Sequence, residues 1–425
     1  MAAAHTQWMR RAATVLVAGV LALTAVPAAA QAQTIRGMQW YLDFLHVQQA
    51  QAISDGSGVT VAVIDSGVDA SHPDLAASVL PGHSFGDAEG KPATQDTNGH
   101  GTHMAGLIAA HGDDTHALGI APGVRILPVR TGVGEGSTQD DDAAGIRWAV
   151  DHGADVINIS SGNNDSTPAL VSAVHYAEIH DVVVVGAAGN VDRGDDGIIA
   201  PGRLKGVLNV TGVNQSGAFW SGSTQGKYAT LSAPAVKIVG PTYVKRGESS
   251  YSEGTGTSDA TAIVSGVAAL VRARYPELNA SNVINRIIRT ATDRGPKGWD
   301  EQYGFGIVNP VAALTTDVPT VDKDPLGGPV PDPLASSAAP GGGAATPGDG
   351  STKPNASGSG FSAARLAVFG ALALVVLVIV VVVLLVLSRR RAGSRPASRP
   401  APARQAQPVP WPNADRNPIP PSRQE

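Results

Sequence analysis

Short runs of valine and isoleucine that alternate with helical patterns most constrain how this chain can fold. Each run is rich in β-branched residues, ends in polar or glycine residues, and has the length of a strand rather than a helix. Helical patterns follow at 143–150 and 167–180. Strands that alternate with helices predict an α/β fold with a doubly wound, mostly parallel sheet flanked by helices, and place chemistry at the carboxyl ends of the strands. The predicted strands cover residues 59–64, 123–130, 155–160, 182–185, 207–213 and 228–233.

Three glycine-flanked polar motifs stand at the edges of these elements. Asp65 closes the first strand in Val-Ile-Asp-Ser-Gly-Val, and His100 begins His-Gly-Thr-His-Met-Ala-Gly. Ser258 follows Gly-Thr where an apolar helix begins, so unpaired N–H groups and a positive dipole end would favour attack by its hydroxyl on a carbonyl. The structural alternative is that Asp65 and Ser258 simply cap the next element. The chain order Asp, His, Ser is that of subtilisin.

At these motifs, over residues 56–316, the chain resembles the subtilisin-like serine peptidases, or subtilases. The resemblance implies that Ser258 attacks the peptide carbonyl, that His100 takes and returns the proton, and that Asp65 orients the imidazole. The segment Gly-Ala-Ala-Gly-Asn ending at Asn190 resembles the family's oxyanion-hole segment. The side chain of Asn190 and the backbone N–H of Ser258 are therefore expected to hold the oxyanion.

The resemblance also implies where the substrate lies. The substrate-binding residues that it implies are Ser160, Ser161, Gly162, Ala187, Ala188 and Gly189. The acidic residues that follow Asn190, namely Asp192, Asp195 and Asp196, are expected to lie in a solvated loop rather than in the site.

No metal or other cofactor is expected. His100 and His103 are three residues apart, but the Glu of the H-E-x-x-H pattern is missing, so a zinc metallopeptidase lacks its remaining ligands. Residues 140–142 are three consecutive aspartates, for which structural calcium is the alternative. Calcium needs six to eight oxygen ligands, so these aspartates are expected to begin a helix, whose dipole favours acidic residues in the first turn.

Composition limits the compartment and the partners. The net charge of −5 gives no basic footprint, so nucleic acid is not expected as a partner. The chain has no cysteine, and a domain of this size has enough core to fold outside the cytoplasm without disulfides.

The two ends of the chain predict export and membrane anchoring. Paired arginines, an apolar run and small residues before position 33 are typical of a secretory signal peptide. Near the other end, an uncharged apolar run exceeds the roughly 20 residues that span a bilayer and is followed by three arginines, which favour the cytoplasmic side. The predicted segments are a signal peptide at 1–32, an N-terminal arm at 33–55, a peptidase domain at 56–316, a Pro/Gly/Ala/Ser-rich linker at 317–362, a transmembrane helix at 366–387 and a basic, proline-rich cytoplasmic tail at 388–425.

This layout, with Trp40 in a short arm, resembles the mycosins, which are subtilases associated with type VII secretion. We therefore expect a single-pass, membrane-anchored serine endopeptidase whose catalytic domain is extracytoplasmic. Its partners would be protein or peptide substrates, the membrane and a type VII-like secretion complex, whose own or exported proteins it would process. The alternative is a non-catalytic, subtilase-like scaffold for such a complex, although no residue of the expected triad is lost.

Overall fold

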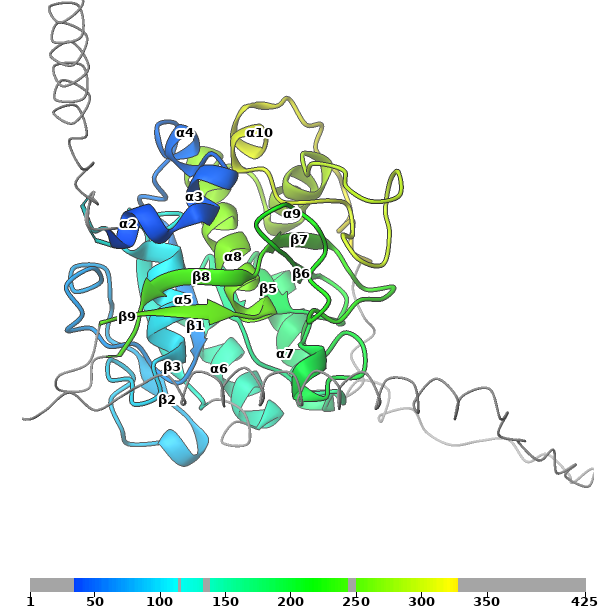
Figure 1. Cartoon of the computed structure of the whole chain (residues 1–425). Helices are drawn as coiled ribbons and strands as arrows, with labels where there is room; N and C mark the ends of the chain where they lie inside the picture. The colour runs from blue at the N-terminus through cyan, green and yellow to red at the C-terminus, as the bar shows by residue number, and fades with distance from the viewer. Residues whose placement is uncertain (1–33, 114–115, 133–137, 244–249, 328–425) are drawn as a thin grey trace, which may run out of the picture. The chain divides into compact units, whose positions relative to one another are not determined.

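The computed structural model describes residues 34–113, 116–132, 138–243 and 250–327. Its centre is a seven-stranded parallel sheet in the order β2-β3-β1-β4-β5-β6-β7 (Figure 1). The sheet strands are β1 (Thr60–Asp65), β2 (His83–Ser84), β3 (Arg125–Arg130), β4 (Val156–Ile159), β5 (Val183–Ala187), β6 (Val207–Val213) and β7 (Leu231–Pro234). A separate antiparallel pair consists of β8 (Val236–Pro241) and β9 (Tyr251–Thr255).

Helices cover both faces of the sheet, as a doubly wound fold requires. Alternate residues of β1 show this: Val61 and Val63 belong to one core cluster with α5 and α8, whereas Ala62 and Ile64 belong to a second cluster with α6 and α7. The helices are α2 (Ile35–Met38), α3 (Trp40–Phe44), α4 (Val47–Gln51), α5 (His100–Ala109), α6 (Gln139–Asp151), α7 (Pro168–Ile179), α8 (Thr257–Arg274), α9 (Ala280–Arg289) and α10 (Pro310–Thr315), with 3-10 turns η1 (Gly86–Ala88) and η3 (Val191–Arg193).

The prediction of an α/β fold with a mostly parallel sheet is confirmed, and some details of the strands differ. The short edge strand β2 was not predicted, because two residues are too few to show a period. The last sheet strand begins at Leu231 rather than at Tyr228, whose side chain is exposed. The prediction that Asp140, Asp141 and Asp142 begin a helix is confirmed, since all three lie in the first turn of α6.

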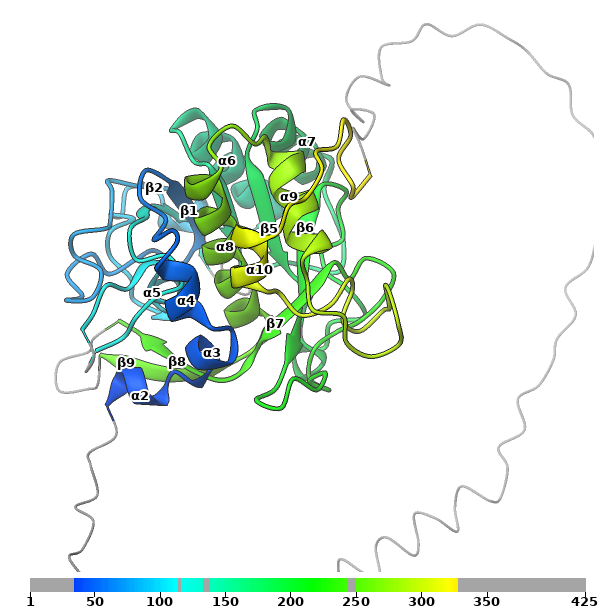
Figure 2. The ribbon, with the colours of Figure 1, turned by 90° about the horizontal axis from the view of Figure 1, so that it is seen from above.

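The N-terminal arm packs on the catalytic body through buried polar and aromatic side chains. Gln39 donates to the carbonyls of Leu118 and Val239, and its own Oε1 accepts from the N–H of Leu118. The indole N–H of Trp40 donates to the carbonyl of Val236, 3.1 Å away. The arm thereby lies along β8 (Figure 2).

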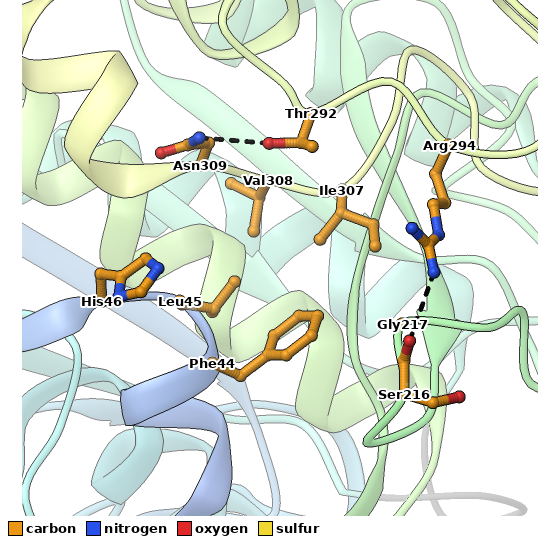
Figure 3. Close-up of a pocket in the computed structure, with 10 residues that line it drawn as sticks. All are labelled: Phe44, Leu45, His46, Ser216, Gly217, Thr292, Arg294, Ile307, Val308 and Asn309. Carbon is orange, nitrogen blue, oxygen red and sulfur yellow. Dashed lines mark hydrogen bonds between the residues drawn. The ribbon is translucent and has the colours of Figure 1, made fainter.

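A pocket of about 260 Å³ lies where the arm meets the segment 292–309 (Figure 3). Phe44 and Leu45 contribute its apolar wall, and Arg294 stands across from them with a hydrogen bond to the carbonyl of Ser216. The side chain of Asn309 donates to Thr292 at the pocket's upper edge. Asp65, His100 and Ser258 line no part of this pocket, so it is separate from the expected site.

Several predicted segments fall wholly or partly outside the described residues. Residues 317–327 of the linker are described and run beside α9, where Asn285 donates to the carbonyl of Pro319. Among the described residues, no helix combines the length and apolar character needed to cross a bilayer. The segments 1–32, 328–362, 366–387 and 388–425 lie outside the described part.

Candidate active site

Asp65 and His100 meet at the carboxyl end of β1. Asp65 is fully buried as the last residue of that strand, and His100 is the first residue of α5. The imidazole Nδ1 lies 2.9 and 2.8 Å from the two carboxylate oxygens. A side chain at Gly101 would stand about 2.1 Å from the carbonyl oxygen of Gly67, so only glycine lets the helix start this close to the strand.

A second buried carboxylate, Asp96, ties these two elements together. Its Oδ1 accepts from the hydroxyl of Ser66, next to Asp65, and from the backbone N–H groups of Asn98 and Gly99. Its Oδ2 accepts from the N–H and the hydroxyl of Thr102. Five hydrogen bonds thus fix the entry of α5 against the end of β1. Sequence reasoning missed Asp96, although an aspartate four residues before the motif histidine was a visible signal.

The nucleophile candidate Ser258 is the second residue of α8 and lines one pocket with His100. Its hydroxyl donates to the carbonyl of Ser160 at 2.9 Å, and the hydroxyl of Ser160 donates back to the carbonyl of Ser258 at 3.2 Å. This reciprocal pair holds the helix start against the end of β4. To act as a nucleophile, the Ser258 side chain must rotate from Ser160 toward Nε2 of His100.

Asn190 follows β5 and lies against the same helix start. Its Oδ1 accepts from the N–H of Thr257 at 2.9 Å and from the Thr257 hydroxyl at 3.3 Å. These two donors fix the orientation of the amide, so that Nδ2 is the group left to donate. A Cβ atom at Gly256 would lie 3.9 Å from that nitrogen, so this glycine adjoins the amide.

A pocket of about 300 Å³ adjoins Asn190 and holds most of the predicted substrate-binding residues. Ser160, Ser161, Gly162, Ala187 and Gly189 line it.

The remaining predicted residue, Ala188, does not line the pocket. It packs in a small apolar cluster with Ile198 and Ala229, because successive residues of an extended segment point to opposite sides. The side chain of Ala188 is therefore buried in the core.

Asp195 was expected in a solvated loop, and this expectation is wrong. Its carboxylate accepts from the backbone N–H of Asn190 at 2.6 Å and lines the 300 Å³ pocket. Arg193 lines this pocket and also the pocket that holds His100 and Ser258. A loop of this kind has no repeating sequence pattern that indicates which residues it contacts. The contact of Asp195 with Asn190 is therefore visible only in the folded structure.

His103, the second histidine of the motif, has partners different from those of His100. Its Nδ1 lies 3.0 Å from the carbonyl oxygen of Pro241. Its Nε2 lies 3.0 Å from Oδ1 of Asp259, without the alignment of a hydrogen bond. Asp259 directly follows Ser258, and sequence reasoning did not single it out.

The pKa of His100 is raised above its ordinary value by its surroundings. Burial lowers this pKa, but the negative charge of Asp65 and the hydrogen bond to it outweigh burial. The charge of Asp259 raises the pKa further, whereas the charge of Arg193 opposes it. The imidazolium that forms when His100 takes a proton is therefore stabilised.

Comparison with known proteins agrees with this fold. The subtilase family model matches residues 56–306, more than half of the chain, so the chain belongs to the subtilase family and is a subtilisin-like serine peptidase. It is 39% identical over 272 residues to the thermostable alkaline protease of Halalkalibacterium halodurans, covering 64% of this chain and 72% of that protein. It is 38% identical over 268 residues to subtilisin DY of Bacillus licheniformis, covering 62% of this chain and 93% of the relative.

Among solved structures, the chain is similar to mycosins. MycP1 from Mycobacterium smegmatis has a TM-score of 0.58 and 32% identity, covering 66% of this chain and 85% of that one. MycP3, described as a protease from the type VII (ESX-3) secretion system, has a TM-score of 0.57 and 30% identity, covering 65% of this chain and 88% of that one.

Proposed function

We propose that the chain is an endopeptidase that uses Asp65, His100 and Ser258 as its catalytic triad. The observation that carries the proposal is the contact of His100 Nδ1 with both oxygens of the buried Asp65, in a pocket that Ser258 also lines. A proton held on Nδ1 by the carboxylate leaves Nε2 as the base.

In the proposed reaction, Ser258 Oγ turns from the carbonyl of Ser160 to Nε2 of His100. His100 takes the hydroxyl proton while Oγ attacks the peptide carbonyl, and then gives the proton to the leaving amine. Asp65 keeps the imidazole oriented and offsets its positive charge. The oxyanion would accept from Nδ2 of Asn190 and from the N–H of Ser258 at the positive end of α8.

The substrate would lie across the pocket beside Asn190. Ser160, Ser161 and Gly162 at the end of β4 would bind the peptide backbone and frame one side chain. Gly189, held by the hydroxyl of Thr257 through a 3.1 Å hydrogen bond, would form the opposite rim.

We further propose that the peptidase is exported and held at the membrane by residues 366–387, with its catalytic domain outside and 388–425 in the cytoplasm. The apolar run and the arginines that follow it support this topology. Similarity to MycP1, described as from the ESX-1 type VII secretion system, supports a role in processing proteins of, or exported by, a type VII-like system.

Replacing Ser258 with alanine tests the chemistry. In subtilisin, a member of the same family, losing the serine costs about 2 × 10⁶ in kcat. Ser258→Ala should therefore abolish hydrolysis of a peptide by the full chain, whereas Ser221→Ala, at an exposed serine, should retain it. A Ser258→Ala enzyme with a tenth of wild-type turnover would show that another group is the nucleophile. A wild-type chain without any hydrolytic activity would favour the scaffold alternative.

The topology is tested on intact, wall-stripped cells. External protease should remove the catalytic domain and spare a tag placed after Glu425. Loss of the tag with protection of the catalytic domain would show the inverse orientation.

A further inference from the structure

Three aromatic side chains gather on a surface away from the candidate active site. Among the described residues, the exposed large apolar side chains include three aromatics: Tyr228 at 43%, Trp299 at 42% and Phe305 at 38% exposure. All three line one pocket of about 270 Å³. These three residues are called the aromatic patch below.

The aromatic patch is held rigidly by the backbone beneath it. The indole N–H of Trp299 donates to the carbonyl of Ala229 at 2.7 Å. Phe305 stands between Gly304 and Gly306, both in the left-handed region, where a side chain would collide with the neighbouring backbone. Apolar rings are thus presented to solvent in a fixed arrangement, which costs stability unless something covers them.

Charged side chains surround the aromatic patch without making it strongly basic. Arg203, Lys205 and Lys227 line the same pocket, and the ammonium of Lys227 lies 4.9 Å from the ring centre of Tyr228. The carboxylates of Glu178 and Asp324 lie near Gly206 and offset part of this charge. Aromatic rings with long cationic side chains at their rim suit the boundary between lipid headgroups and acyl chains.

The chain leaves the described domain at this same place. Leu326 lines the pocket with the aromatic rings, and Gly327, the last described residue, lies beside the stem of Lys205. Only residues 328–365 separate Gly327 from the apolar run at 366–387. The aromatic patch thus lies where the chain leaves the described domain on the way to the proposed anchor.

We propose that the aromatic patch is a lipid-binding surface that rests on the outer face of the membrane. This inference rests on the proposed membrane anchoring. It adds a direct contact to the tethering by the anchor: the domain touches the bilayer with one defined face. Insertion of the rings, rather than charge, would supply the attraction.

The test uses the absence of native cysteine to place one fluorescent label on the full chain. Lys227→Cys carries an environment-sensitive label at the rim of the patch, and Ile53→Cys carries it at an exposed position after α4 as the control. Each labelled chain is reconstituted into phosphatidylcholine vesicles with or without brominated acyl chains, which quench a label that lies near them. Because interfacial aromatic rings lie roughly 5–10 Å into the headgroup region, quenching at 227 should be at least about threefold that at 53.

A second variant asks whether the rings make the contact. Tyr228→Ser with Phe305→Ser, in the Lys227→Cys chain, should reduce the quenching to that of the control while hydrolysis of a soluble peptide is retained. Persistent quenching in this variant would overturn the inference. A second result would also overturn the inference. If the Lys227→Cys chain cross-links to a second copy through its single thiol, and quenching is equal at positions 227 and 53, the patch is an interface between chains.

Flotation separates the inference from the anchoring on which it rests. A chain that floats with the vesicles but shows no excess quenching at 227 retains its anchor and loses the lipid-binding surface. A chain that does not float refutes the anchor, and the inference falls with it.

Discussion

Replacing Asp96 with asparagine should destabilise the domain and slow catalysis together. The carboxylate accepts five hydrogen bonds, and an amide of the same shape can accept at only one of its two ends. If the amide oxygen keeps the three donors at Oδ1, the nitrogen faces the N–H and hydroxyl of Thr102. At about 1.5–3 kcal/mol for each hydrogen bond to a charged group, the loss of these two bonds costs about 3–6 kcal/mol.

Thermal unfolding of the full chain measures this loss. For domains of this size, 1 kcal/mol changes the Tm by roughly 2–4 °C, so the variant should melt roughly 6–24 °C lower. Because the same hydrogen bonds place the first turn of α5, the kcat should also fall, by roughly 10- to 100-fold, as expected for a displaced base. The matched control is Asp55→Asn, whose exposed carboxylate accepts from Ser57 at 2.9 Å and whose amide can keep that bond.

The control should melt within about 3 °C of the wild type, as expected for an exposed polar group. An Asp96→Asn chain that melts within about 2 °C of the wild type would refute the reasoning, since the loss of the two buried hydrogen bonds from Thr102 would then cost almost nothing. Normal stability with reduced kcat would instead mean that Asp96 acts on the reaction and not on the fold.

Two further predictions concern the reaction itself. Because the pKa of His100 is raised and the base must be neutral, kcat/KM should rise with pH through a midpoint above about 6.5, and Asp65→Asn should move that midpoint to lower pH. Stability from protonated His100 is present below about pH 6.5 and lost as pH rises through its folded-state pKa. Asn190→Ala should lower kcat by roughly 10²–10³ with little change in KM, as found for the oxyanion-hole asparagine of subtilisin, and a loss confined to KM would make Asn190 a substrate-binding residue.

The fold could be predicted from the sequence because buried parallel strands leave continuous apolar runs. β6, for example, begins and ends where the run at 207–213 does. The chain positions of Asp65, His100 and Ser258 could be predicted because each stands at the edge of such an element. Their contacts could not, since the rotation of the Ser258 hydroxyl toward Ser160 depends on a partner 98 residues away.

Loop residues were beyond sequence reasoning for a different reason. Asp96 and Asp195 act by returning to backbone N–H groups a few residues away, and such hydrogen bonds leave no repeating pattern. The burial of the Ala188 side chain could not be predicted for the same reason. In an extended segment neighbouring residues face opposite sides, and the phase of that alternation is set by packing that the sequence does not show.

Covalent labelling tests the central claim most directly. The full chain is treated with a labelled fluorophosphonate that reacts only with an activated serine, and the modified peptide is identified by mass spectrometry. We expect one modification, on Ser258, that is lost in His100→Ala because the base that activates the hydroxyl is gone. Labelling at another serine, or no labelling of a folded chain, would contradict the assignment of Ser258 as the nucleophile.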